Sequence, residues 1–316
     1  MNKTKRNLFY FFILIIMVAF MYSISYGVAA AQQDTANKLP SAPLPTYKVG
    51  TTFIYSNGAW ETVTATAPGM VTWTDHRGVI SSGSPDFTYR AAKWQSRTRR
   101  GTRQYTARND LLIHKSTSLW PLKRSNAASY SETGIWQRKE EPANSYRANW
   151  SCRVEGTERV SVMAGEFDTW KIVCTRYSVP TSSGTTRARE TRTWYYSPEI
   201  EHYVLMTSSY YYDKPSRRQE LLAVLPPYDG IPIVARRKLN KSFQQAMEFK
   251  RSGESVSWSA PQAAVSGEII PKGTFKLADG SYSRRYVQRL NLPDGQRTYY
   301  GMAVRDAKGV WGIPRR

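Results

Sequence analysis

The sequence predicts a mainly β protein, in which an antiparallel β domain is followed by a small α+β domain of one helix and an antiparallel sheet. From about Gly50, short stretches rich in Val, Thr, Tyr and Trp are separated by turn pairs such as Asn57-Gly58 and Pro68-Gly69. This pattern is typical of β-strands joined by tight turns. One helical segment near the C-terminus precedes further strand-like stretches, an order typical of α+β domains. With 316 residues, 41% of them apolar, the chain can bury cores, which excludes disorder of the whole chain.

The N-terminus carries the features of an export signal. Three basic residues in the first six positions precede an uncharged stretch over residues 8–31, which ends on small residues. A stretch of this length also suffices to span a bilayer, so residues 1–31 are either a signal peptide or an N-terminal membrane anchor. Residues 32–48 contain three prolines among small polar residues, and we expect a flexible linker there.

The chain is strongly basic, with 45 Lys and Arg against 24 Asp and Glu, a formal charge of +21. Only three of these basic residues lie within residues 1–31, so the exported part keeps a charge of +18. Outside the cytoplasm we expect such a protein to meet anionic lipid, lipopolysaccharide or acidic glycan, and to associate with a membrane. Protein partners form a second class. The export signal and the lack of a recognisable motif argue against nucleic acid. Basic residues that merely solvate strand faces remain the alternative interpretation.

Five arginines around Tyr105 are the best candidates for binding an anionic ligand. They are Arg97, Arg99, Arg100, Arg103 and Arg108. Guanidinium groups bind phosphate and carboxylate groups in a bidentate manner. In one continuous strand Arg97, Arg99 and Arg103 would share a face. Arg100 and Arg108 would take the opposite face, so a single patch is not assured. An exposed basic loop is the other interpretation.

The two cysteines lie in the clearest predicted hairpin, over residues 149–177. Alternation of apolar and polar residues places Cys152 and Cys174 on its apolar face. A reversal near residues 165–166, within the turn at residues 164–168, would put Cys174 opposite about residue 157 rather than opposite Cys152. A disulfide therefore needs a bend, a bulge or an intervening strand, and a pair of buried thiols stays open as the alternative.

The sequence holds no motif for catalysis, for a metal or for a cofactor. The three histidines have no metal or triad spacing, and the Ser-hydrolase, zinc-protease and phosphate-loop motifs are missing. The aromatic stretch over residues 203–212 predicts sheet core, with a lipid-binding or sugar-binding groove as the alternative. We expect a protein that is not an enzyme.

The last section begins with a predicted helix over residues 242–251, capped by Ser242 and ended by Gly253. Its motifs are residues 242–248 (SFQQAME), 256–258 (VSW), 267–271 (GEIIP), 280–286 (GSYSRRY), 301–304 (GMAV) and 309–311 (GVW). On these motifs, residues 238–316 resemble the surface-antigen domain of the seventeen-kilodalton outer-membrane antigen family. That family usually has cysteines where this chain has Ser283 and Val304. A hairpin closed at Leu292 and Gly295 makes those two positions cross-strand neighbours, close enough for a disulfide in relatives, whereas a one-residue bulge at Gly295 would move the register by one.

The middle section, residues 49–228, carries a second set of motifs. They are residues 119–122 (LWPL), 152–158 (CRVEGTE), 164–171 (AGEFDTWK) and 192–199 (RTWYYSPE). These resemble a periplasmic family of open β half-barrels related in shape to lipoprotein carriers. The resemblance implies an antiparallel half-barrel wrapped around a helix or a groove, although the sequence shows no such helix.

Together these observations predict an exported protein of the periplasm or cell envelope, with anchoring through residues 8–31 left open. The leading hypothesis is a protein that binds or organises anionic envelope components. The alternative is a structural or assembly subunit of an envelope complex.

Overall fold

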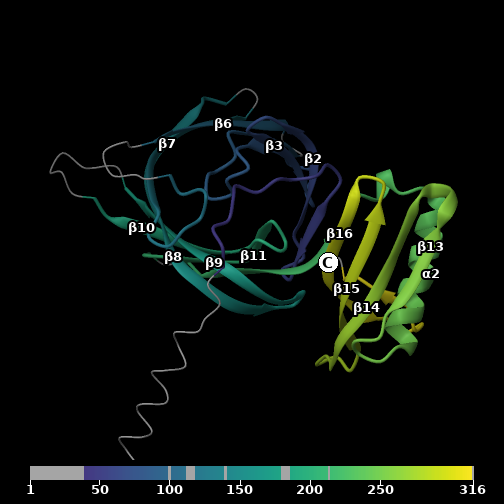
Figure 1. Cartoon of the computed structure of the whole chain (residues 1–316). Coiled ribbons are helices and arrows are strands. Elements are labelled where there is room, and N and C mark those ends of the chain that lie inside the picture. The colour runs from purple at the N-terminus through teal and green to yellow at the C-terminus, as the bar shows by residue number, and fades with distance from the viewer. Residues whose placement is uncertain are drawn as a thin grey trace, which may run out of the picture. The chain divides into compact units, whose positions relative to one another are not determined.

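The computed structural model describes residues 39–98, 101–111, 118–138, 141–178, 186–212 and 214–314 (Figure 1). The predicted signal or anchor (1–31) and residues 32–38 of the predicted linker lie outside this range. Leu39–Arg316 forms one compact unit. Within the described residues, no helix is long and apolar enough to cross a membrane.

Twelve of the described strands form a closed antiparallel barrel, seen as a ring in Figure 1. They are β1 (Thr52–Tyr55), β2 (Trp60–Ala67), β3 (Met70–Asp75), β4 (Ile80–Gly83), β5 (Lys93–Thr98), β6 (Gly101–Leu111), β7 (Ala127–Arg138), β8 (Asn144–Val162), β9 (Gly165–Tyr177), β10 (Ala188–Ser197), β11 (His202–Tyr210) and β12 (Arg217–Leu225). Each strand pairs with the next along the chain. β1 also pairs with β12, with Phe53 opposite Val224. The expected half-barrel is therefore wrong in extent, because this last pairing leaves no open edge.

Alternation of side chains builds the barrel wall. In β8 the buried positions Ala148, Trp150, Cys152 and Val154 alternate with more exposed ones, and the same period runs through β9. Successive residues of a strand point to opposite faces, so one row of apolar side chains fills the interior while the polar row meets water.

Irregular segments enter the barrel, where the half-barrel resemblance implied a helix or a groove. Residues 84–92 place Phe87 against Trp194 and Tyr196, with ring centroids 5.4 Å and 5.8 Å apart. Residues 118–126 bring in Leu122, which is fully buried and pairs with Ala42 of the N-terminal segment. Large aromatic rings from these segments supply the core volume, so the described interior contains no helix.

Cys152 lies directly opposite Cys174, and the two are joined by a disulfide. The register expected from the sequence is wrong for two reasons. The hairpin turns at residues 163–164, with Val162 paired to Gly165, and the register then shifts between Val154 and Gly156. An earlier turn and a bulge together move Cys174 from the neighbourhood of residue 157 to that of Cys152.

The C-terminal section contains α2 (Ile233–Phe249), which packs against β13 (Val256–Ala260) and β14 (Val265–Lys276). β15 (Tyr282–Leu292), β16 (Gly295–Arg305) and β17 (Trp311–Gly312) complete the antiparallel strands. Two short 3-10 helices, η2 (Tyr228–Gly230) and η3 (Pro261–Ala263), lie in the connections. Gly301 of β16 pairs with Ala223 of β12, so these strands continue the sheet of the barrel.

The helix α2 begins nine residues before the predicted start at Ser242. Its buried positions Ala235, Leu239, Ala246 and Met247 follow helical spacing and face the sheet. The basic residues of the first turns hide this spacing in the sequence. At the other end, Arg284 donates hydrogen bonds to the carbonyl oxygens of Met247 (2.7 Å) and Lys250 (2.6 Å), which satisfies acceptors that a helix end leaves free.

The hairpin of β15 and β16 closes as the sequence predicts. Leu292 is opposite Gly295, and Ser283 is opposite Val304. The two positions at which the antigen family carries cysteines are cross-strand neighbours here, which confirms the predicted register.

Candidate functional site

The five candidate arginines do not form one patch in the part that the structure describes. Arg97 is opposite Thr102 in the β5–β6 hairpin, whereas Arg103 is opposite Ser96. Directly opposed residues share a face and neighbours alternate, so Arg97 and Arg103 lie on opposite faces of the hairpin. In one continuous strand Arg97 and Arg103 would share a face, but the chain reverses between β5 and β6, which places them on opposite faces.

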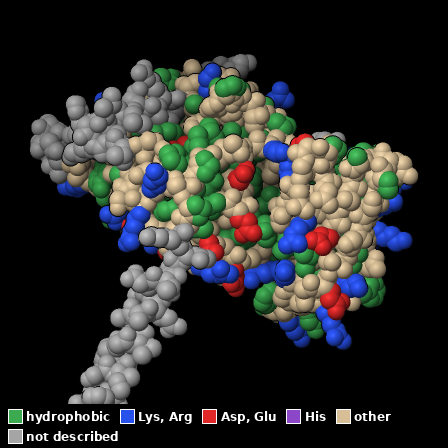
Figure 2. Space-filling view, viewed as in Figure 1, with side chains coloured by type: hydrophobic (Ala, Val, Ile, Leu, Met, Phe, Trp, Pro, Cys, Tyr) green, Lys and Arg blue, Asp and Glu red, His purple; other side chains and the backbone are tan. Residues whose placement is uncertain are grey.

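The remaining three arginines lie wholly or partly outside the described residues. Arg99 and Arg100 lie outside the described residues, as does the side chain of Arg108, whose backbone pairs with Thr133. Figure 2 shows Lys and Arg side chains over both the barrel and the C-terminal strands of the viewed face. Anion binding by these arginines stays a prediction.

A buried polar cluster inside the barrel is a stronger candidate site. His202 of β11 is buried, and its Nδ1 and Nε2 atoms each lie 2.9 Å from a tyrosine hydroxyl, those of Tyr47 and Tyr55. Tyr55 donates a hydrogen bond to Glu61 of β2, and Tyr203 donates another at 3.3 Å. Tyr55 has a single proton and gives it to Glu61, so Nε2 of His202 carries the imidazole proton and Nδ1 accepts from Tyr47.

The electrostatics of this cluster leave one uncompensated charge. Burial lowers the pKa of His202, and the opposing contact with Glu61 does not reverse the shift, so the imidazole is neutral near pH 7. Burial raises the pKa of Glu61, but hydrogen bonds from His202, Tyr55 and Tyr203 outweigh it and hold the pKa below its ordinary value. Glu61 is therefore an ionised carboxylate beside a neutral histidine.

A cavity of about 180 Å³ opens beside this cluster. Glu61 and His202 line it together with Gly83, Ser84, Pro85, Ala91 and six aromatic side chains, namely Tyr47, Trp73, Phe87, Tyr89, Trp194 and Tyr203. The rings support one another: the centroids of Tyr47 and Trp73 are 4.8 Å apart, as are those of Trp194 and Tyr203. Such packing holds the rings in position around the cavity.

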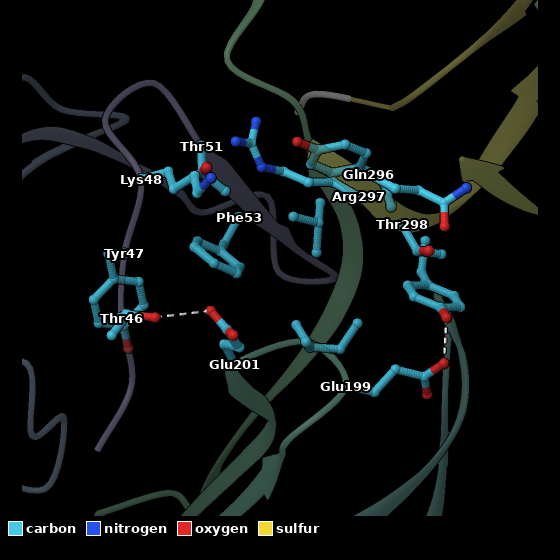
Figure 3. A pocket seen from close by; sticks show the side chains of 14 residues that line it. Thr46, Tyr47, Lys48, Thr51, Phe53, Glu199, Glu201, Gln296, Arg297 and Thr298 are labelled. Carbon is cyan, nitrogen blue, oxygen red and sulfur yellow. Dashed lines mark hydrogen bonds between the residues drawn. The ribbon is translucent and has the colours of Figure 1, made fainter. Parts of the chain in front are cut away.

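A larger cavity of about 460 Å³ lies next to it, between residues 46–53, residues 199–201 and β16 (Figure 3). Its charges balance locally. Lys48 and Arg297 both contact Asp294, while Tyr300 donates to Glu199 and Thr46 donates to Glu201 at 3.2 Å. The two cations thus share one carboxylate and the two lining carboxylates accept from hydroxyl groups, so each charged side chain of this cavity already has a partner.

The exposed face of α2 is a third candidate surface. Its outward residues are Ile233, Val234, Arg237, Lys238 and Lys241, and no acidic residue lies in the first turn. Ile233 and Val234 keep 59% and 57% of their surface exposed. This face combines aliphatic side chains with three cations on one side of a helix.

Sequence reasoning missed Glu61, His202 and the aromatic cavity. These residues come from strands far apart along the chain, and no local spacing links them. Two signals were available. Tryptophan recurs in strand-like stretches, which predicts core equally well, and the aromatic stretch over residues 203–212, which contains Tyr203 of the cavity, had a groove as its alternative interpretation. Across the described ranges no group of three or more His, Cys, Asp or Glu side chains could hold a metal ion.

The fold and site thus define a closed antiparallel barrel with an internal aromatic cavity, extended by strands that carry one helix. No family model matches the chain. It is similar to proteins named 17 kDa surface antigen from Rickettsia felis (33% identity over 84 residues, 27% of this chain and 53% of that protein) and Rickettsia prowazekii (32% over 78 residues, 25% and 49%). A third, from Rickettsia bellii, is 34% identical over 70 residues, 22% of this chain and 44% of that protein. The resemblance to the antigen family is confirmed, and the chain spans about half the length of the curated relatives it matches.

Among solved structures, the chain is similar to the hypothetical lipoprotein YmcC from Escherichia coli. The TM-score is 0.34 at 9% identity, over 60% of this chain and 91% of that chain. A likeness at this level supports no conclusion about the present barrel.

Proposed function

We propose that this chain is an exported, non-enzymatic cell-envelope protein that binds anionic lipid through the exposed face of α2. Its similarity to proteins named surface antigen and its predicted export signal support the envelope location. The exposed face of α2 carries the binding proposal. Among the described residues its three cations make no ion pair, although Lys238 donates to the carbonyl oxygen of Ser259 at 2.8 Å, and they lie beside exposed aliphatic side chains.

The arrangement of charge on α2 is costly for the helix itself. Arg236, Arg237 and Lys238 lie in its first turns, where the positive end of the helix dipole disfavours cations. Pro232 at the N-cap makes no side-chain hydrogen bond, so the first backbone N–H groups receive no side-chain cap. An anionic headgroup at this end of α2 would offset the unfavourable positive charge and would also accept hydrogen bonds from the uncapped backbone N–H groups.

Lipid fits this face better than a glycan does. Ile233 and Val234 are exposed next to the cations, and aliphatic side chains gain free energy when they enter the acyl region beneath the headgroups. Each Lys or Arg near an anionic membrane surface contributes about 1 kcal/mol. A soluble acidic glycan would use the cations and leave the aliphatic pair in water.

Vesicle sedimentation with full-length exported protein tests the proposal. We expect binding to vesicles that contain phosphatidylglycerol and little binding to pure phosphatidylcholine. Arg237→Glu with Lys241→Glu should weaken binding by an order of magnitude or more. The matched control, Lys123→Glu with Arg124→Glu, makes the same change of charge at two exposed positions of the barrel and should bind as the wild type does.

Three results would overturn the proposal. An equal loss in both double variants would mean that net charge alone drives binding. Binding to a soluble acidic polysaccharide but not to vesicles would assign the surface to glycan. A protein complex that persists in high salt, with no vesicle binding, would favour the structural or assembly subunit.

A further inference from the structure

We propose that the aromatic cavity inside the barrel is a binding site for a small organic ammonium cation. The inference concerns a site separate from α2 and does not depend on the proposed lipid binding.

The walls of the cavity have the chemistry that recognises such cations. Six aromatic side chains line it, among them Trp73 and Trp194, and no Lys or Arg occurs among its described lining residues. The faces of aromatic rings carry negative electrostatic potential and attract ammonium groups, most strongly where water is excluded. An anion would meet no positive charge there.

Glu61 supplies the negative charge. The hydrogen bonds from Tyr55 and Tyr203 both end on Oε1, which is also 3.5 Å from Nε2 of His202. Among the described residues, Oε2 of Glu61 accepts no hydrogen bond, and the side chain keeps 28% of its surface open. One carboxylate oxygen thus remains available beside the rings.

The neighbouring groups do not neutralise this charge. His202 already uses both ring nitrogens in hydrogen bonds with Tyr47 and Tyr55, and burial lowers its pKa. The tyrosines donate protons and remain uncharged, since burial raises the pKa of Tyr47 and Tyr203 well above the ordinary value. A carboxylate that is largely enclosed and has no charged partner among the described residues is unfavourable, and a bound cation would reduce that cost.

The size of the cavity narrows the ligand class. A volume of about 180 Å³ suits a headgroup-sized ammonium ion. Two sources share this chemistry: a trimethylammonium group, as in choline or a choline headgroup, and the protonated amine of an amino sugar.

Binding to the purified full chain by NMR and calorimetry tests the site. We expect choline to bind, with its N-methyl proton signal shifted upfield by the aromatic rings. The neutral isostere 3,3-dimethyl-1-butanol should bind at least about tenfold more weakly, because it keeps the shape and loses the charge. Glycerophosphocholine represents the choline headgroup and glucosamine represents the amino sugar. Comparing the affinity of each with that of choline distinguishes the two sources.

Glu61→Gln keeps an acceptor oxygen for the tyrosines and removes the charge, so it should weaken choline binding by an order of magnitude or more. Glu201→Gln, in the larger cavity, is the matched control and should bind choline as the wild type does. If Glu61→Gln does not fold, the choline and isostere comparison on the wild-type protein decides alone.

Equal affinities for choline and its neutral isostere would overturn the proposal, as would full binding by a folded Glu61→Gln variant. Absence of binding by choline, tetramethylammonium and glucosamine alike would also overturn it. None of these results bears on vesicle binding through α2.

Discussion

The carboxylate Oε1 of Glu61 on β2 lies 3.5 Å from Nε2 of His202 on β11, although these two strands are not neighbours in the barrel. β1 and β12 lie between them, and the contact forms because these two strands pair and close the ring. Tyr55 of β1 links the two residues by hydrogen bonds with both. Assembly of the polar cluster therefore requires closure of the barrel.

The first prediction is that acidification destabilises the protein through His202. Its pKa lies below the ordinary value of 6.5 in the folded state, so the unfolded chain binds more protons and stability falls as pH decreases through 6.5. Glu61, whose folded pKa is also lowered, adds a further loss below its ordinary value of 4.5. The slope from one group is at most about 1.4 kcal/mol per pH unit.

Urea unfolding between neutral and mildly acidic pH measures this slope. His202→Gln should flatten it, whereas His76→Gln, at an exposed position of the barrel, should leave it unchanged. An unaltered slope in a folded His202→Gln variant would contradict the assignment.

The second prediction concerns the disulfide between Cys152 and Cys174. Both side chains are buried, and the bond closes a loop with a sequence separation of 22. Cys152→Ala with Cys174→Ala should lower the free energy of unfolding by about 3 kcal/mol, because the unfolded chain gains freedom. Thiol titration of the denatured exported protein should detect no free thiol before reduction. Two free thiols at that stage would support the alternative of unbridged cysteines.

The third prediction is that Ser283→Cys with Val304→Cys restores the bridge expected in the antigen family. The two residues are directly opposed, and Ser283 is buried. The new bond should form on export and raise the free energy of unfolding by about 3 kcal/mol. Mass spectrometry of the non-reduced protein detects the bond, and each single variant is its control. Persistent free thiols in the folded double variant would show that the side-chain directions do not suit a disulfide.

The fourth prediction tests the seam between β12 and β16. A Cβ atom at Gly301 would lie 2.5 Å from Oη of Tyr286 and 2.9 Å from Cβ of Ala223, closer than packed atoms tolerate. Gly301→Ala should therefore destabilise the protein by about 1–3 kcal/mol and speed hydrogen exchange in β16. Gly312→Ala, where a Cβ would meet no atom within 4 Å, should be nearly neutral. Unchanged stability of Gly301→Ala would show that this seam yields without cost.

Local patterns predict only part of this molecule. Period-two alternation correctly places Cys152 and Cys174 on the buried face, and the turn at residues 293–294 sets the pairing of Ser283 with Val304. The helix start is missed because Arg236, Arg237 and Lys238 mask the buried spacing of Ala235 and Leu239. The candidate arginines are misplaced for another reason: a reversal between Arg97 and Arg103 puts them on opposite faces.

The sequence by itself determined the β character of the chain, the buried face of the cysteine hairpin and the likeness to the surface antigens, because these depend on residues close together along the chain. Only the tertiary structure decided that β1 meets β12, that Cys174 meets Cys152, and that Glu61 faces His202 beside an aromatic cavity. Register and closure depend on where turns and bulges fall and on pairing between distant strands. A shift of one residue reverses every face, so local alternation cannot specify them.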